Sequence, residues 1–349
     1  MKSIIIILNT QDQMPNGKEK DSCYISSQII KTKFIYLFLL ILLSMKISIM
    51  NSQTPYEDPN HYVLDTEENF SYFNSNLWNI VPNNTWGQET YSPNNVIVSN
   101  GVLTLKCEKV GNNYISGGIE TVNKKAFPYG YFEIESKTPL SGNKGPWGGF
   151  WMHTGEGGWD ELDILEPNGW DNYLGTQYHI GVSASNSGFH EACAKTITVS
   201  QDMSSGFHKY AVIWTPKYVK FLYDGVPVYE EVTPNYIPTH PMFVFLTFQI
   251  DTDNRAPDAS TTFPLFWQFK HFKYYRLKTN CNTSIIQSNF DFINHDYKVY
   301  KSYSLANSTV PNNSNIVLRA KDYILLNGEF TVPLGSTFWA ITHNGICPE

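Results

Sequence analysis

The stretch GGWDELDILEPNGW, residues 157–170, places Glu161, Asp163 and Glu166 within a short apolar run, and the fold is inferred outward from it. Neighbouring side chains of a β-strand point to opposite faces, so residues two apart share a face. Glu161 and Asp163 therefore point the same way, and the apolar residues between the acids point into a core. In a regular strand Glu166, five positions after Glu161, would face that core.

A β-bulge at Ile164-Leu165 removes this conflict, because one extra residue restores the phase and puts all three acids in one row. The three carboxylates of such a row repel one another, and their partial burial costs desolvation energy. Such groups therefore usually differ in protonation state. With carboxyl groups about 5–5.5 Å apart, a double-displacement glycosidase can use Glu161 as nucleophile and Glu166 as proton donor. Asp163 would orient Glu161. The spacing alone also fits a solvent-facing acidic strand edge or a calcium site.

The residues around this stretch form short alternating or apolar runs separated by Gly, Pro and Asn, with no helical periodicity. The pair Asp224-Gly225 is a strong two-residue hairpin signal. Many short strands over about two hundred residues predict one antiparallel sandwich or barrel. The predicted strands include residues 102–107, 131–137, 209–214, 220–230, 242–250 and 267–277.

Near the start, Lys31 and Lys33 precede the apolar run 34–43. About ten apolar residues are too few for an ordinary membrane-spanning helix but suit a secretory signal. We therefore expect a secreted or cell-surface protein, with membrane contact only if the segment is kept as an anchor. The predicted layout is an N-terminal extension and signal segment (1–52), a linker (53–62), a β-sandwich (63–278) and a small C-terminal β module (279–349).

Five cysteines are present, and Cys23 would be lost with the signal. In an oxidising compartment the remaining four allow three pairings, and sequence does not choose among them. Cys281 and Cys347 lie near the two ends of the C-terminal tail, so a disulfide between them would close it. The other two are Cys107 and Cys193.

The formal charge is −7 and the basic residues are scattered, which argues against a nucleic-acid partner. The aromatic content of 15% suits carbohydrate binding, although aromatics also fill large β cores. Neither CxxC nor HExxH occurs, so no zinc site is expected. We expect a monomer without a cofactor.

The run ELDILE (161–166) resembles the ExDxxE signature of glycoside hydrolase family 16 in its bulged, laminarinase-like form. Neighbouring segments fall in that family's order and cover most of residues 63–278. The resemblance implies a jelly-roll antiparallel β-sandwich with a concave substrate cleft, and retaining endo-hydrolysis of a β-linked polysaccharide. It assigns nucleophile, orienting Asp and acid/base to the three acids already named. The matching segments are 86–108, 115–130, 127–152 and 207–225.

The resemblance also suggests residues that contact the sugar. Two tryptophans match the family's W-x-x-F-W segment, one precedes the nucleophile, and three residues belong to a segment that often contacts sugar hydroxyls. Two more alternate on a strand expected beside the catalytic one, and the second of these, His179, is equally compatible with a core position. In this order they are Trp147 and Trp151; Trp159; Trp86, Glu89 and Tyr91; Gln177 and His179.

The expected substrate is a β-1,3- or mixed-linkage β-glucan, and the bulged signature favours the β-1,3-glucan, since lichenase-type relatives lack the extra residue of the bulge. Gly118 and Glu135 stand where many relatives carry Arg, and Lys270 stands where an Asp helps to hold a structural calcium. The resemblance therefore does not extend to that calcium. Alternatives are an agar, porphyran or carrageenan hydrolase, a non-catalytic β-glucan-binding protein, and a surface adhesin that acts through the tail.

Overall fold

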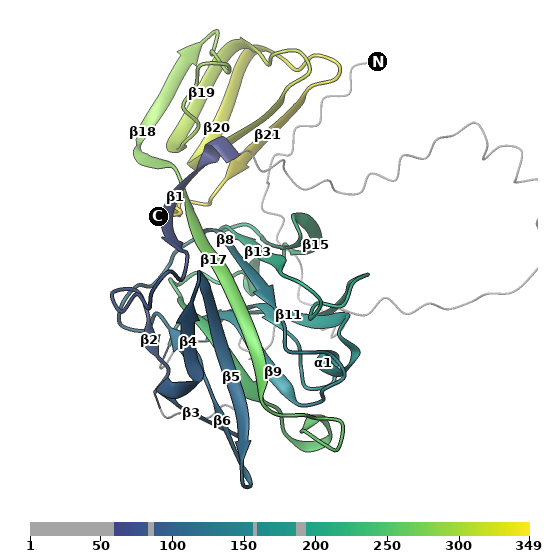
Figure 1. Cartoon of the computed structure of the whole chain (residues 1–349). Helices are drawn as coiled ribbons and strands as arrows, with labels where there is room; N and C mark the ends of the chain where they lie inside the picture. Colours follow the sequence, from purple (N-terminus) through teal and green to yellow (C-terminus); the bar gives the residue numbers. More distant parts are fainter. Residues whose placement is uncertain (1–58, 83–86, 156–158, 186–192) are drawn as a thin grey trace, which may run out of the picture.

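The computed structural model describes residues 59–82, 87–155, 159–185 and 193–349 (Figure 1). Strands dominate the described part, which confirms the all-β prediction. Helical turns there are short: the elements are η1 (Pro59–His61), η2 (Pro93–Asn95), α1 (Asp171–Leu174), η4 (Pro234–Tyr236) and η5 (Asp253–Arg255).

One layer of the sandwich is a ten-stranded sheet. Its strands are β1 (Tyr62–Glu68), β3 (Glu89–Tyr91), β4 (Val96–Ser99), β5 (Val102–Val110), β6 (Asn113–Ser116), β8 (Gly130–Lys137), β13 (His208–Trp214), β14 (Val219–Tyr223), β15 (Val226–Glu231) and β17 (Leu265–Leu277). The order is β15-β14-β13-β8-β17-β5-β6-β3, with β1 beside β17 and β4 beside β5.

The second layer is a seven-stranded sheet. It contains β2 (Asn79–Ile80), β7 (Gly118–Glu120), β9 (Pro146–His153), β10 (Glu161–Glu166), β11 (Gln177–Ser183), β12 (Cys193–Thr198) and β16 (Phe243–Ile250). The order β12-β11-β10-β9-β16-β7-β2 puts the acidic strand β10 between β9 and β11. The three acids are thus flanked by a strand on each side.

The predicted hairpin is present between β14 and β15, which pair in antiparallel fashion. Its turn residues Asp224 and Gly225 have positive φ angles of 48° and 78°. This geometry matches the twist of the flanking strands, and Asp-Gly adopts it readily.

The C-terminal residues form a third sheet of four strands in chain order: β18 (Thr279–Ser288), β19 (Val299–Thr309), β20 (Asn315–Thr331) and β21 (Thr337–Thr342). All three pairings are parallel. The longest of these strands, β20, has 17 residues. A separate apolar cluster that includes Phe290, Tyr303 and Leu318 lies here. That residues 279–349 form an independent domain stays a prediction.

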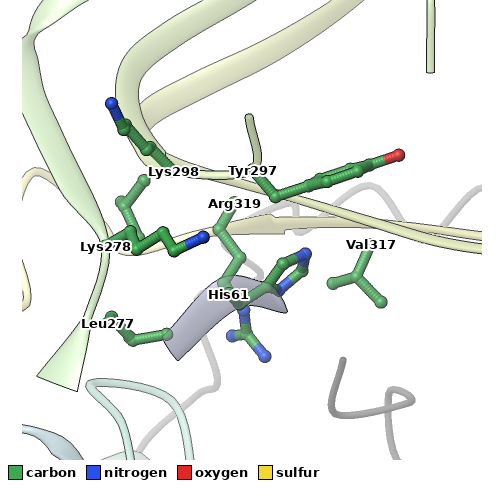
Figure 2. A pocket seen from close by; sticks show the side chains of 8 residues that line it. His61, Leu277, Lys278, Tyr297, Lys298, Val317 and Arg319 are labelled. Carbon is green, nitrogen blue, oxygen red and sulfur yellow. The ribbon is translucent and has the colours of Figure 1, made fainter. Parts of the chain in front are cut away.

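Of the pairings that the sequence left open, the disulfide between Cys281 and Cys347 is present and ties the segment after β21 to β18, whereas Cys107 is a buried free thiol. Contacts also join this sheet to the sandwich: Arg319 Nη2 donates to Tyr218 Oη at 3.2 Å. Figure 2 shows a hollow at this junction, whose lining includes His61, Lys278 and Arg319.

The expected signal segment, and the linker up to residue 58, lie outside the described residues. Within the described part of the chain, no helix is long and apolar enough to cross a membrane.

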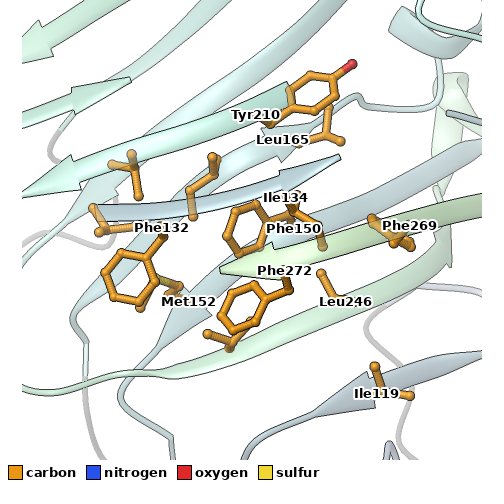
Figure 3. Packing of buried hydrophobic residues seen from close by; sticks show 14 of the residues in the cluster. Ile119, Phe132, Ile134, Phe150, Met152, Leu165, Tyr210, Leu246, Phe269 and Phe272 are labelled. Atoms are coloured by element: carbon orange, nitrogen blue, oxygen red, sulfur yellow. The ribbon is translucent and has the colours of Figure 1, made fainter. Parts of the chain in front are cut away.

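The core of the sandwich lies between its two layers (Figure 3). Phe132 of β8, Phe150 of β9, Leu165 of β10 and Tyr210 of β13 all have 0% exposure. Burying such a side chain contributes about 1.5–3 kcal/mol, so each strand is held with its apolar face inward. On β10 the acids are thereby forced onto the outer face of the seven-stranded sheet.

Candidate active site

The bulge in β10 occurs where the sequence predicted it. Asp163 lies opposite Trp151 of β9, but Leu165 lies opposite Phe150, so Ile164 is the extra residue. Ile164 and Leu165 are both buried, whereas the three acids are only partly buried. Glu161, Asp163 and Glu166 therefore share the outer face of the sheet.

A glycine on β9 makes room for the bulge. Gly149 has a φ of +132°, a conformation that favours glycine. The carbonyl oxygen of Leu165 stands where a β-carbon on this residue would be. The close approach of the two strands therefore depends on the absence of a side chain at position 149.

Asp163 occupies the middle of the acidic row. Its cross-strand partners are Trp151 on β9 and Gly181 on β11. The carboxylate of Asp163 lies in the space that a side chain at Gly181 would fill. A second glycine thus opens the sheet surface for an acid.

Glu166 lies beyond the bulge, opposite His179 of β11. The indole Nε1 of Trp147 donates to Glu166 Oε1 at 3.0 Å. His179 Nε2 lies 2.7 Å from Asp171 Oδ2, and this carboxylate raises the pKa of His179 against the opposing effect of burial. His179 is thus partly exposed beside Glu166, and its contact with a sugar stays a prediction.

Glu161 lies opposite His153 of β9. The His153 Nε2 and Glu161 Oε2 atoms are 3.9 Å apart. Sequence reasoning did not single out His153. The two-residue alternation from Trp151 would have placed it on the same face of β9.

A ring contact and a hydrogen bond hold the Trp151 side chain in place. Its ring stacks on Phe245 of β16 with centroids 4.3 Å apart, and its Nε1 donates to Thr247 Oγ1 at 2.9 Å. The indole is partly exposed beside Asp163. A flat apolar surface therefore adjoins the acids.

The predicted sugar contacts at Glu89 and Tyr91 are wrong for this structure. Glu89 is 0% and Tyr91 5% exposed. Glu89 Oε2 accepts from the Ile250 amide at 2.8 Å, and the Tyr91 ring lies where a side chain on Gly118 would be. Both residues are buried and hold β3 against the seven-stranded sheet. Trp86 lies outside the described residues.

The two remaining predicted contacts are accessible. Trp159 is 52% exposed, and Gln177 Nε2 donates to Thr198 Oγ1 at 3.4 Å. An exposed aromatic pair that the sequence reasoning missed follows β10: Trp170 and Tyr173 stack with centroids 5.3 Å apart. Only their place directly after the acidic strand could have indicated this pair.

Within the described ranges, one group of side chains has the ligand types of a metal site: Cys281, Cys347 and Glu349. Its two sulfur atoms form the disulfide. This group therefore offers no thiolate ligands while the disulfide is intact.

A family model described as "Glycosyl hydrolases family 16" matches residues 83–264, about half of the chain. A curated endo-1,3-1,4-beta-glycanase of Rhizobium meliloti is 32% identical over 174 residues, which are 47% of this chain but only 36% of that relative. A beta-glucanase of Paenibacillus polymyxa is 31% identical over 219 residues, 59% of this chain and 86% of that relative.

Solved structures with the same fold include a laminarinase from Flavobacterium sp. UMI-01. It is 26% identical, has a TM-score of 0.53, and the match covers 61% of this chain and all of that one. The beta-glucanase of Bacillus licheniformis, at 23% identity and a TM-score of 0.53, shares the fold. These matches agree with the predicted jelly-roll sandwich.

Proposed function

The chain belongs to glycosyl hydrolases family 16, and from this we propose that it is a retaining, endo-acting hydrolase of β-glucan. The observation that carries the proposal is the row on β10, where a bulge brings Glu161, Asp163 and Glu166 to one solvent-facing surface. Three partly buried carboxylates in a row are costly for stability alone, so a catalytic use is the economical explanation.

In the first step, a carboxylate oxygen of Glu161 attacks the anomeric carbon and forms a glycosyl ester. Glu166 in its acid form gives its proton to the glycosidic oxygen, whose bond to the anomeric carbon breaks. The leaving chain departs with a new hydroxyl group, and Glu166 is left as a carboxylate.

In the second step, Glu166 takes a proton from a water molecule, and the water oxygen attacks the anomeric carbon. The bond to Glu161 breaks, which restores its carboxylate, and the proton on Glu166 is ready for the next cycle. Two inversions at the same carbon retain the β configuration. Asp163, between the two glutamates, orients Glu161 and adjusts the proton affinity of the row.

The surrounding aromatic side chains support a polysaccharide substrate. Trp151 and the exposed Trp159 offer flat faces on which the C–H faces of pyranose rings can stack. The stacked pair Trp170 and Tyr173 extends this apolar surface after the end of β10. We propose these residues as sugar platforms on either side of the acidic row.

We propose β-1,3- or mixed-linkage β-glucan as the substrate. The names of the similar proteins, an endo-1,3-1,4-beta-glycanase and a laminarinase among them, support this class. Within this class, the bulged form of the acidic strand supports a β-1,3-glucan over a mixed-linkage β-glucan.

We further propose that the protein is exported. The disulfide between Cys281 and Cys347 suits an oxidising compartment, and a polysaccharide substrate is met outside the cell. Fractionation of cells that express the full chain would test this: retention in the cytoplasm contradicts export.

The function is tested by incubating the full chain with laminarin, lichenan, agarose, porphyran and carrageenan and measuring reducing ends. We expect release from laminarin or lichenan, and proton NMR should show the β anomer first. Release from a galactan alone, or an α anomer as first product, would contradict the proposal.

A further inference from the structure

His153 is placed to act on the proposed nucleophile. It lies directly opposite Glu161 in the β9–β10 ladder, with 3.9 Å between Nε2 and Glu161 Oε2. Both side chains are partly buried, at 24% and 35% exposure. A contact in this setting is shielded from water better than a surface pair.

The backbone fixes which ring nitrogen of His153 carries the proton. The amide of Gly155 donates to Nδ1 at 2.9 Å, so Nδ1 is an acceptor and the proton of the neutral ring is on Nε2. Burial lowers the pKa of His153, against the opposing field of Asp160. The neutral ring therefore directs an N–H group to the side of Glu161.

Phe243 and Asp160 lie close to His153. Phe243 of β16 is the cross-strand partner of His153 on the other side of β9. The ring of Phe243 packs beside Gly155, which has a φ of +87°. The buried Asp160 carboxylate accepts hydrogen bonds from the amides of Ser185, Thr239 and His240 at 2.6–2.9 Å. Among the described residues, the charged and titratable groups near His153 include Asp160, Glu161 and, through Asp160, His240.

We propose that His153 is a positioning residue that donates its Nε2–H to one carboxylate oxygen of Glu161 and leaves the other oxygen to attack the anomeric carbon. This rests on the proposed function. The 3.9 Å between Nε2 and Glu161 Oε2 is longer than a hydrogen bond, and we expect it to shorten when substrate binds, as hydrogen bonds in active sites often do. A neutral donor orients the carboxylate without the strong attraction of a full positive charge, which would weaken the nucleophile.

Two variants separate positioning from packing. His153→Leu fills similar space without a donor, and His153→Gln keeps an N–H donor. His271→Asn is the matched control, because His271 is exposed on β17, in the other layer, and Asn tolerates its positive φ of 50°. All variants are first compared with the wild type by melting temperature and near-ultraviolet circular dichroism.

On the best substrate of the panel, we expect His153→Leu to lower kcat about tenfold or more with KM changed less than threefold. The acidic limb of its pH profile should move to higher pH, because the ionised nucleophile has lost a donor. His153→Gln should recover most of kcat, and His271→Asn should match the wild type. Wild-type kcat and pH profile in His153→Leu, or equal losses in the Leu and Gln variants, would overturn the proposal.

A readout without substrate keeps this test separate from the proposed function. Carbon-13 NMR of labelled glutamate carboxyls, with the Glu161 signal assigned by its loss in Glu161→Gln, gives the titration midpoint of Glu161. His153→Leu should raise this midpoint and His153→Gln should leave it nearly unchanged. An unchanged Glu161 midpoint in His153→Leu overturns the role of His153. If the midpoint is raised in His153→Leu but the wild type does not hydrolyse any substrate, only the proposed hydrolase function is refuted.

Discussion

The carbonyl oxygen of Leu165 occupies the space that a β-carbon on Gly149 would need. The glycine lies on β9 and the carbonyl belongs to the bulge in β10, next to Glu166. The two strands can approach this closely only because position 149 has no side chain and adopts a φ of +132°. The position of the proposed acid/base thus depends on a residue of the neighbouring strand.

Gly149→Ala should destabilise the protein by about 3 kcal/mol, since it adds both a clash and an unfavourable backbone conformation. The hydrolysis rate should fall by more than the loss of folded protein explains, because relief of the clash displaces the bulge and Glu166. Urea denaturation and hydrolysis rates measure the two effects. Gly206→Ala is the control, since no atom lies within 4 Å of its β-carbon position. Equal behaviour of the two variants would show that the bulge does not need Gly149.

Glu161→Gln should lower kcat by more than about a thousandfold, because the amide cannot form the glycosyl ester. The change in volume is small, so folding and oligosaccharide affinity should persist. Calorimetric titration with laminarin oligosaccharides measures the affinity. Glu67→Gln, at an exposed position of β1, is the matched control and should remain active. A Glu161→Gln variant with full turnover would remove Glu161 from the mechanism.

Glu166→Ala should slow cleavage most for substrates with poor leaving groups, because these need the proton that Glu166 supplies. Azide should partly restore activity toward an activated aryl β-glycoside. It attacks the anomeric carbon of the glycosyl-enzyme and displaces Glu161, so the product should be a β-glycosyl azide. Proton NMR identifies the anomer. An α-glycosyl azide would mean that the roles of Glu161 and Glu166 are exchanged.

Two buried histidines should make the protein less stable in acid. Burial lowers the pKa of His61 to about 3 and that of His343 well below its ordinary value. In the unfolded chain both titrate near pH 6.5. Their neighbours add positive charge: Arg319, Lys278 and His295 face His61, and Arg319 and Lys217 face His343.

Below pH 6.5 the unfolded chain therefore binds protons that the folded protein does not, so stability is greatest above this pH and falls as the pH is lowered. Between pH 7 and pH 5 the protonation of His61 in the unfolded chain should cost about 2 kcal/mol, and His343 should act in the same direction. His61→Phe should reduce the loss by about that amount in urea denaturation at the two pH values. His271→Asn should leave the loss unchanged. Identical losses in wild type and His61→Phe would exclude His61 as a cause.

Much of the fold could be predicted because its signals are local. The Asp224-Gly225 pair specifies its hairpin through backbone angles that few residues adopt. In residues 161–166 a regular strand would turn Glu166 toward the core. The bulge at Ile164-Leu165 was therefore required to keep all three acids on one face. These features depend on residues close in sequence, so no knowledge of distant segments was needed.

The errors arose where distant segments meet. Glu89 and Tyr91 were expected at a sugar, but alternation cannot tell whether another layer covers the face to which a side chain points. The amide of Ile250, from β16, approaches Glu89 and closes that face. His153 was missed because its partner Glu161 is on another strand. The register between two strands cannot be read from the sequence of either strand alone.

The sequence by itself determined that this protein is an antiparallel sandwich or barrel of short strands with three acids in phase on one strand, because side-chain period and turn chemistry act over a few residues. Only the tertiary structure decided what those acids meet: Gly149 beneath the bulge, Gly181 beside Asp163, Trp147 on Glu166 and His153 opposite Glu161. Such pairings are set by how the strands pack and shift along one another, which depends on the whole core at once.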